Sequence, residues 1–128
     1  MRCVADASVV VAYLLGEATD AERGGLLDDA HGPTLIDIEV TQTLRGLLRG
    51  GKLDLVTADL GREELGQLRL RRHPDAPLLH RAWELRDVCT TYDALYVALA
   101  EALDARLLTR DARLGRAVTK LIEVVVSG

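Results

Sequence analysis

The chain alternates between short apolar runs and longer stretches of helical periodicity. Residues 2–5 predict a buried strand, and the nearly continuous apolar run that follows predicts a buried helix over residues 7–15. Further strands are expected at residues 34–36, 68–71, 106–109 and 121–126. The apolar spacing and the turn residues predict helices over residues 20–31, 37–49, 57–68, 78–88, 91–103 and 111–118.

Strands that alternate with helices in this way are typical of an α/β protein with a parallel sheet. Right-handed crossover connections place the carboxyl ends of all the strands at one edge of such a sheet. We therefore expect a central parallel β-sheet of roughly four to five strands, flanked by helices on both faces. No repeat or linker divides the sequence, so residues 1–128 are expected to form a single domain.

Composition and charge narrow the class of protein. A chain with 48% hydrophobic and 28% charged residues is typical of globular proteins. The formal net charge of -4 argues against a broad nucleic-acid-binding surface but leaves room for a local basic patch. The two cysteines lack CxxC spacing, which favours a reducing, cytoplasmic compartment over a zinc site or disulfides. No apolar run approaches the roughly 20 residues that span a membrane, and an acid at position 6 argues against a signal peptide.

Four acidic residues fall near the predicted carboxyl ends of strands. Asp6 follows the first strand and Asp111 follows the strand at residues 106–109. Glu39 is expected in the first turn of the helix that follows the strand at residues 34–36. Asp93 is expected in the first turn of the helix over residues 91–103. Because ligands of open parallel sheets bind at that edge, the four carboxylates are expected to converge on one crevice.

Each acid also has a structural explanation. Glu39, Asp93 and Asp111 are each explained singly by helix capping or by the helix dipole, whereas Asp6 interrupts a buried apolar stretch. As a set, carboxylates about 4 Å apart repel by about 4 kcal/mol at an effective dielectric of 20, so they need protons or a hard cation. Oxygen ligands suit Mg²⁺ or Mn²⁺, which predicts metal-assisted hydrolysis of a phosphodiester. No Ser–His–acid or Cys–His set stands out, so water is the expected nucleophile.

Four motifs occur in order along the chain. They read DAS at residues 6–8, LIDIEV at residues 35–40, TTYDALYVALAE at residues 90–101 and LTRDARL at residues 108–114. This set resembles the PIN-domain family, and specifically the VapC toxins of bacterial toxin–antitoxin pairs. The resemblance covers most of the chain, with little signature between residues 51 and 77.

The resemblance implies roles for particular residues. Asp6 and Asp93 would be metal ligands, with Glu39 and Asp111 completing the acidic site directly or through water.

The resemblance also gives roles to hydroxyl and aromatic residues beside these acids. Ser8 and Thr109 would orient carboxylates or metal-bound waters, although helix capping explains either hydroxyl equally well. Tyr92 and Tyr96 are interpreted as packing residues. The three histidines show no ligand spacing and are expected at the surface.

The resemblance further implies an activity and partners. The expected protein is an Mg²⁺- or Mn²⁺-dependent endoribonuclease toxin that acts on RNA, with tRNA among the candidates. It would form a homodimer, and a VapB-type antitoxin would neutralise it by covering the active-site groove. Two groups of basic residues are candidates for RNA contact, although a solvated face or a docking site for an acidic partner is the favoured interpretation for most of them. They are Arg45, Arg49 and Lys52, and Arg69, Arg71, Arg72, His73 and Arg81.

Two other interpretations stay open at this stage. A phosphoacceptor or phosphatase of another doubly wound fold would use Asp6 as a nucleophile, but Ser8 stands where a haloacid-dehalogenase-like enzyme has a second Asp. A receiver domain would need an acidic pair that is missing, although Lys120 matches its late lysine. The second interpretation is a catalytically inactive PIN fold that binds RNA or a protein partner.

Overall fold

A computed structural model describes residues 1–128 and contains one parallel sheet. Its five strands are arranged in the order β3-β2-β1-β4-β5, and every neighbouring pair is parallel. The strands are β1 (Arg2–Ala5), β2 (Asp29–Pro33), β3 (Leu70–His73), β4 (Arg106–Thr109) and β5 (Val124–Val126). The expectation of a parallel α/β sheet is confirmed.

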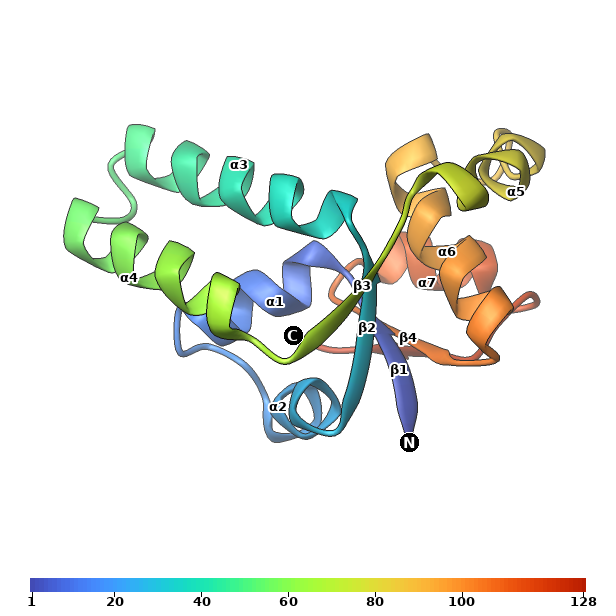
Figure 1. Ribbon diagram of the computed structural model, residues 1–128, viewed down its shortest axis with the longest axis horizontal. Helices are drawn as coiled ribbons and strands as arrows, with labels where there is room; N and C mark the ends of the chain where they lie inside the picture. Colours follow the sequence, from blue (N-terminus) through green and yellow to red (C-terminus); the bar gives the residue numbers. More distant parts are fainter.

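Helices lie on both sides of this sheet. They are α1 (Ala7–Leu14), α2 (Asp20–Leu27), α3 (Leu35–Arg49), α4 (Leu55–Gln67), the 3₁₀ turn η1 (Ala76–Leu78), α5 (Leu79–Glu84), α6 (Thr91–Leu103) and α7 (Ala112–Val118). Figure 1 shows α1, α3 and α4 on one side of the strands and α5, α6 and α7 on the other, with α3 and α4 forming a hairpin. None of these helices has the length and apolar character needed to cross a membrane.

Helix α6 is the central element of the core. Its residues 94–100 are all buried, and the helix packs against β1, β2 and β4. A helix that is apolar on every side has to be enclosed, and the sheet on one side and α5 on another enclose it here. The structure begins and ends α6 at the residues that the sequence pattern predicts.

The second strand lies in a different place from the expected one. Residues 34–36 do not form a strand, and the helix expected over residues 20–31 ends at Leu27. The strand is Asp29–Pro33, whereas Leu35 and Ile36 open α3 and Ile36 is fully buried. Hydrophobic periodicity misses β2 because its central buried residue is a histidine, His31.

The side chain of His31 is only 5% exposed, so its expected surface position is wrong. Its Nε2 lies 2.8 Å from Oδ1 of Asp29, and its Nδ1 lies 2.8 Å from Nε2 of His73 in β3. These bonds satisfy the buried ring, as a buried polar group requires. The polar residues of this segment therefore belong to the inside of the sheet.

Several further boundaries differ from the expected ones. The strand β3 is Leu70–His73 and not residues 68–71, and the helix α4 is Leu55–Gln67 and not residues 57–68. The helix expected over residues 78–88 consists of η1 and the short α5, which ends at Glu84. The final strand is confined to Val124–Val126 because residues 121 and 122 form a turn after α7.

Candidate active site at the carboxyl edge of the sheet

Asp6 is the most deeply buried of the four predicted acids. It follows β1, its amide donates to the carbonyl of Leu108 at 3.0 Å, and its side chain caps α1 by accepting from the amide of Val9 at 3.3 Å. The hydroxyl of Ser8 donates to one carboxylate oxygen at 2.5 Å, and the hydroxyl of Thr109 donates to the other. Asp6 is 7% exposed, and this burial raises the pKa of its carboxyl above the ordinary value.

The two predicted hydroxyls connect Asp6 to the opposite side of the site. Oγ of Ser8 accepts from the amide of Arg110 at 3.1 Å, and Oγ1 of Thr109 accepts from the amide of Asp111 at 3.0 Å. Neither hydroxyl caps a helix, so the capping explanation does not apply to them. Both fix the orientation of a carboxylate, as polar neighbours of metal ligands do.

Glu39 lies one turn inside α3, because this helix begins at Leu35 and not at residue 37. The hydroxyl of Tyr96, a buried residue of α6, donates to Oε1 of Glu39 at 2.5 Å. Burial raises the pKa of Glu39, the hydrogen bond from Tyr96 opposes the rise, and the negative charges of Asp93 and Asp6 add to it. The packing role expected for Tyr96 is thus incomplete, and Tyr92 is exposed.

Asp93 and Asp111 lie at the starts of α6 and α7. The amide of Asp93 donates to the Thr90 hydroxyl at 3.1 Å, and the side chain of Asp111 caps α7 by accepting from the amide of Leu114 at 3.1 Å. The pKa of Asp93 is raised by its burial and further by the charge of Asp111. Both side chains line one open cavity of about 570 Å³.

The four carboxylates form one electrostatic cluster. The charge of Asp93 raises the pKa of Asp6 and of Glu39, and the charge of Asp111 raises that of Asp93. No Lys or Arg forms an ion pair with any of the four, so their repulsion is not relieved from within the chain.

Arg110, one of the two arginines within the motifs, faces away from the cluster. Its Nη2 and Nε lie 2.7 and 2.8 Å from the carboxylate of the buried Glu22 in α2. The guanidinium of Arg110 is thus paired with Glu22 and with none of the four clustered acids.

The four acids suit a hard cation that keeps part of its water shell better than a cation that is enclosed by protein ligands alone. No three His, Cys, Asp or Glu side chains converge closely enough to hold one ion by themselves. Mg²⁺ usually keeps several waters and takes one or two carboxylates together with phosphate oxygens of the substrate. Such ligands are offered around one edge by Asp6, Glu39, Asp93 and Asp111, none of which forms an ion pair with a Lys or Arg.

Long-range contacts that the sequence pattern does not predict hold the start of α3. Arg72 of β3 donates to both carboxylate oxygens of Asp37 at 3.0 and 3.2 Å, and Asp75 accepts from the amide of Leu35 at 3.0 Å. The amide of Thr34 donates to the carbonyl of His73 at 2.8 Å. These bonds fix the helix that carries Glu39, and they occupy Arg72, one of the bases considered for RNA contact.

This fold and this site define a PIN-domain protein. The sequence profile of the PIN domain matches residues 3–120, so the chain belongs to the PIN-domain family.

Within that family, the chain is similar to ribonucleases of the VapC group. It is 41% identical over 120 residues to Ribonuclease VapC1 of Mycobacterium tuberculosis, covering 91% of this chain and 90% of the relative. It is 42% identical over 120 residues to Ribonuclease VapC3 of the same species, covering 91% and 87%.

Solved structures show the same fold at lower identity. PAE2754 from Pyrobaculum aerophilum has a TM-score of 0.70 at 23% identity, covering 96% of this chain and 83% of that one. VapBC2 from Rickettsia felis, solved with a DNA fragment from its promoter, has a TM-score of 0.69 at 13% identity and covers both chains fully.

Proposed function

We propose that the protein is an endoribonuclease toxin that hydrolyses RNA phosphodiester bonds with Mg²⁺ or Mn²⁺. The observation that carries the proposal is the cluster of four carboxylates at the carboxyl edge of the sheet, unpaired with any cation of the chain. The curated relatives named as ribonucleases support RNA as the substrate class.

In this proposal, Asp6 and Asp93 hold the ion, and Glu39 and Asp111 contact it directly or through water. The ion, when bound, lowers the pKa of water and neutralises charge on the phosphoryl group. The chain itself supplies orientation, because hydroxyls keep the key carboxylates in place.

The proposal extends to partners and to the place of action. VapBC2 of Rickettsia felis and a toxin–antitoxin complex from Klebsiella pneumoniae share this fold, the latter with a TM-score of 0.64 at 14% identity. A VapB-type antitoxin that covers the acidic groove, a homodimer and a cytoplasmic location all belong to the proposal. So does tRNA as a candidate substrate.

The test compares cleavage with metal binding on the same antitoxin-free protein. Total cellular RNA, tRNA included, is incubated with Mg²⁺, Mn²⁺ or a chelator, and Mn²⁺ binding is followed by calorimetry. Cleavage that requires the ion supports the nuclease. Ion binding by folded protein without cleavage of any RNA would favour the inactive binding module instead.

A further inference from the structure

The cavity that contains Asp93 and Asp111 also carries two arginines. Arg86 comes from the turns after α5, and Arg113 comes from the first turn of α7. Both side chains are exposed, and neither forms an ion pair, although a third carboxylate, that of Asp87, lines the same cavity. Two arginines therefore line this opening, and neither guanidinium is paired with a carboxylate.

The guanidinium of Arg86 is held in place by Trp83. Its Nη1 donates to the carbonyl of Trp83 at 3.1 Å, and its carbon lies 5.0 Å from the centre of the exposed indole ring. A cation–π contact of this kind restrains the side chain without consuming its charge. Arg86 is thus oriented in advance for an anion, and a planar guanidinium matches the oxygens of a phosphate.

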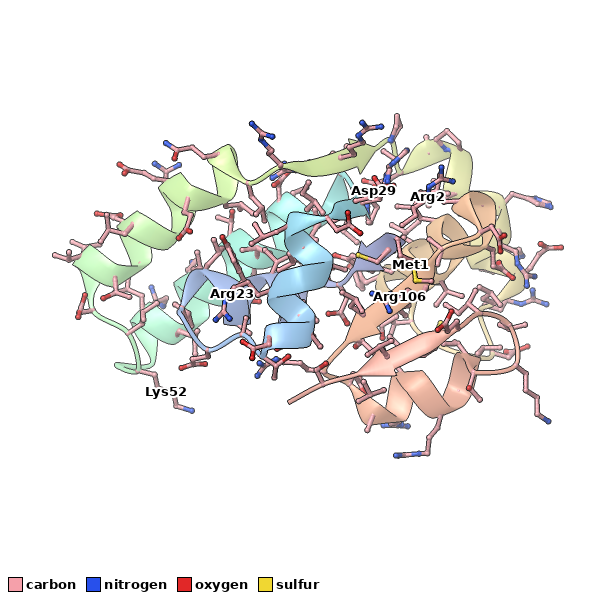
Figure 2. All side chains as sticks on the ribbon, turned by 90° about the horizontal axis from the view of Figure 1, so that it is seen from below. Met1, Arg2, Arg23, Asp29, Lys52 and Arg106 are labelled. Carbon is pink, nitrogen blue, oxygen red and sulfur yellow. The ribbon has the colours of Figure 1, made fainter.

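The basic residues that the sequence suggests for RNA contact do not line this cavity. Arg72 is bound to Asp37, and Arg81 is bound to Glu101 at 2.8 Å. Lys52 lies at the far end of the α3–α4 hairpin (Figure 2). The cations that share a cavity with Asp93 and Asp111 are Arg86 and Arg113.

We propose that Arg86 and Arg113 bind a backbone phosphate of the RNA strand beside the phosphate that is cut. This inference rests on the proposed nuclease function. When one phosphate of the RNA strand lies at Asp93 and Asp111, a neighbouring phosphate of the same RNA strand lies in the same cavity. Near so many carboxylates, that phosphate would be repelled unless local cations offset them. The two arginines are therefore positioning residues that fix the register of the strand.

The test measures RNA binding and cleavage for alanine variants. Arg86→Ala and Arg113→Ala are each expected to raise KM for a short single-stranded RNA about tenfold, with kcat changed much less. Fluorescence anisotropy on an Asp6→Asn background, which keeps the RNA intact, gives Kd across salt concentrations. The slope of log Kd against log salt should fall by about 0.7 for each arginine removed.

Two control variants make the test specific. Arg116→Ala removes an exposed arginine from the same helix, outside the cavity, and should leave KM and the salt slope unchanged. Asp87→Asn removes a negative charge from the cavity wall and should lower KM about twofold. Thermal melting checks that every variant is folded.

The outcomes separate this inference from the proposed function. If the protein cleaves RNA and the Arg86 and Arg113 variants behave like Arg116→Ala, the inference is wrong and the nuclease stands. Weaker binding of an acidic peptide with unchanged RNA binding would assign the arginines to a protein partner and also overturn it. If wild-type protein cleaves no RNA, the proposed function fails, and the salt slope alone decides whether the arginines bind phosphate.

Discussion

At the scale of single residues, two of the four clustered acids also have a role in the fold. Asp6 caps α1 and accepts hydroxyl bonds from Ser8 and Thr109, while Asp111 caps α7. The sequence pattern gives Asp6 no capping role, yet it caps α1. Among Glu39, Asp93 and Asp111, the capping explanation is confirmed for Asp111 alone, because Thr90 caps α6 and no side chain caps α3. It does not compete with the catalytic explanation, because an N-cap carboxylate keeps lone pairs for a further partner.

Asp6→Asn separates the two roles. The amide oxygen can still cap α1, but the amide nitrogen cannot accept from the Thr109 hydroxyl. This lost bond opposes the gain from removing a buried charge, so we expect a net change below about 1 kcal/mol in the free energy of unfolding. RNA cleavage should disappear. Cleavage assays beside chemical denaturation check both points, and an unfolded variant would mean that Asp6 is mainly a structural acid.

Asp93→Asn is expected to stabilise the protein while it abolishes cleavage. The pKa of Asp93 is raised in the folded state, first by burial, so its ionised form disfavours folding at any pH above that pKa. The amide removes this cost, and the gain should vanish below pH ~4, where the carboxyl is protonated in both states. Melting curves at pH 7 and pH 3.5 test the sign. A variant less stable than wild type at pH 7 would contradict the account.

At the scale of helices and strands, the hydrophobic pattern predicts an element correctly where one face of that element, or all of it, is buried. It predicts both ends of α6 and of β4 correctly, because few other structures can bury an unbroken apolar run. It misses β2 because Asp29 and His31 are polar, and the buried His31 ring is satisfied by Asp29 and by His73, which is 42 residues away from His31. Long-range hydrogen bonds of this kind leave no periodic signal.

The Glu22–Arg110 pair joins α2 to the end of β4. Glu22 is buried, and the bonds from Arg110 hold the pKa of its carboxyl below the ordinary value. Its stabilisation is therefore present above the unfolded pKa of about 4.3 and is lost as the pH falls through the lower, folded value. Glu22→Gln should cost about 2–3 kcal/mol at pH 7, below the usual loss for a buried pair because Arg110 is 27% exposed. The difference between the variant and wild type should shrink steadily below pH 4 in denaturation experiments, and a constant difference would contradict the prediction.

Two adjacent glycines of α2 provide a matched test of how this helix packs on the sheet. A Cβ at Gly25 would lie 2.5 Å from Cδ1 of Leu108, a buried residue of β4, whereas a Cβ at Gly24 would meet open space. Gly24→Ala should stabilise by about 1 kcal/mol through helix propensity. Gly25→Ala should be less stable than Gly24→Ala by about 1–3 kcal/mol, since the core has to move. Equal stability of the two variants in urea would mean that α2 packs less closely than the structure shows.

At the scale of the whole molecule, topology explains why separate acids meet. Parallel strands joined by helices bring the ends of β1 and β4 and the starts of α3 and α6 to one edge (Figure 1). The sequence order of the motifs is enough to predict this edge and its four acids. It is not enough to predict the hydroxyl of Tyr96 on Glu39 or the position of Arg86 and Arg113, which depend on how α5, α6 and α7 turn toward the cavity.

The most direct measurement of the central claim is cleavage of RNA by the purified chain and by Asp93→Asn, each with Mg²⁺ and with a chelator. The account predicts cleavage only by the wild-type chain and only with the ion, while both proteins give the same folded circular dichroism spectrum. Cleavage that persists in the chelator, or in the Asp93→Asn protein at the wild-type rate, would contradict the assignment of the acidic edge as the active site.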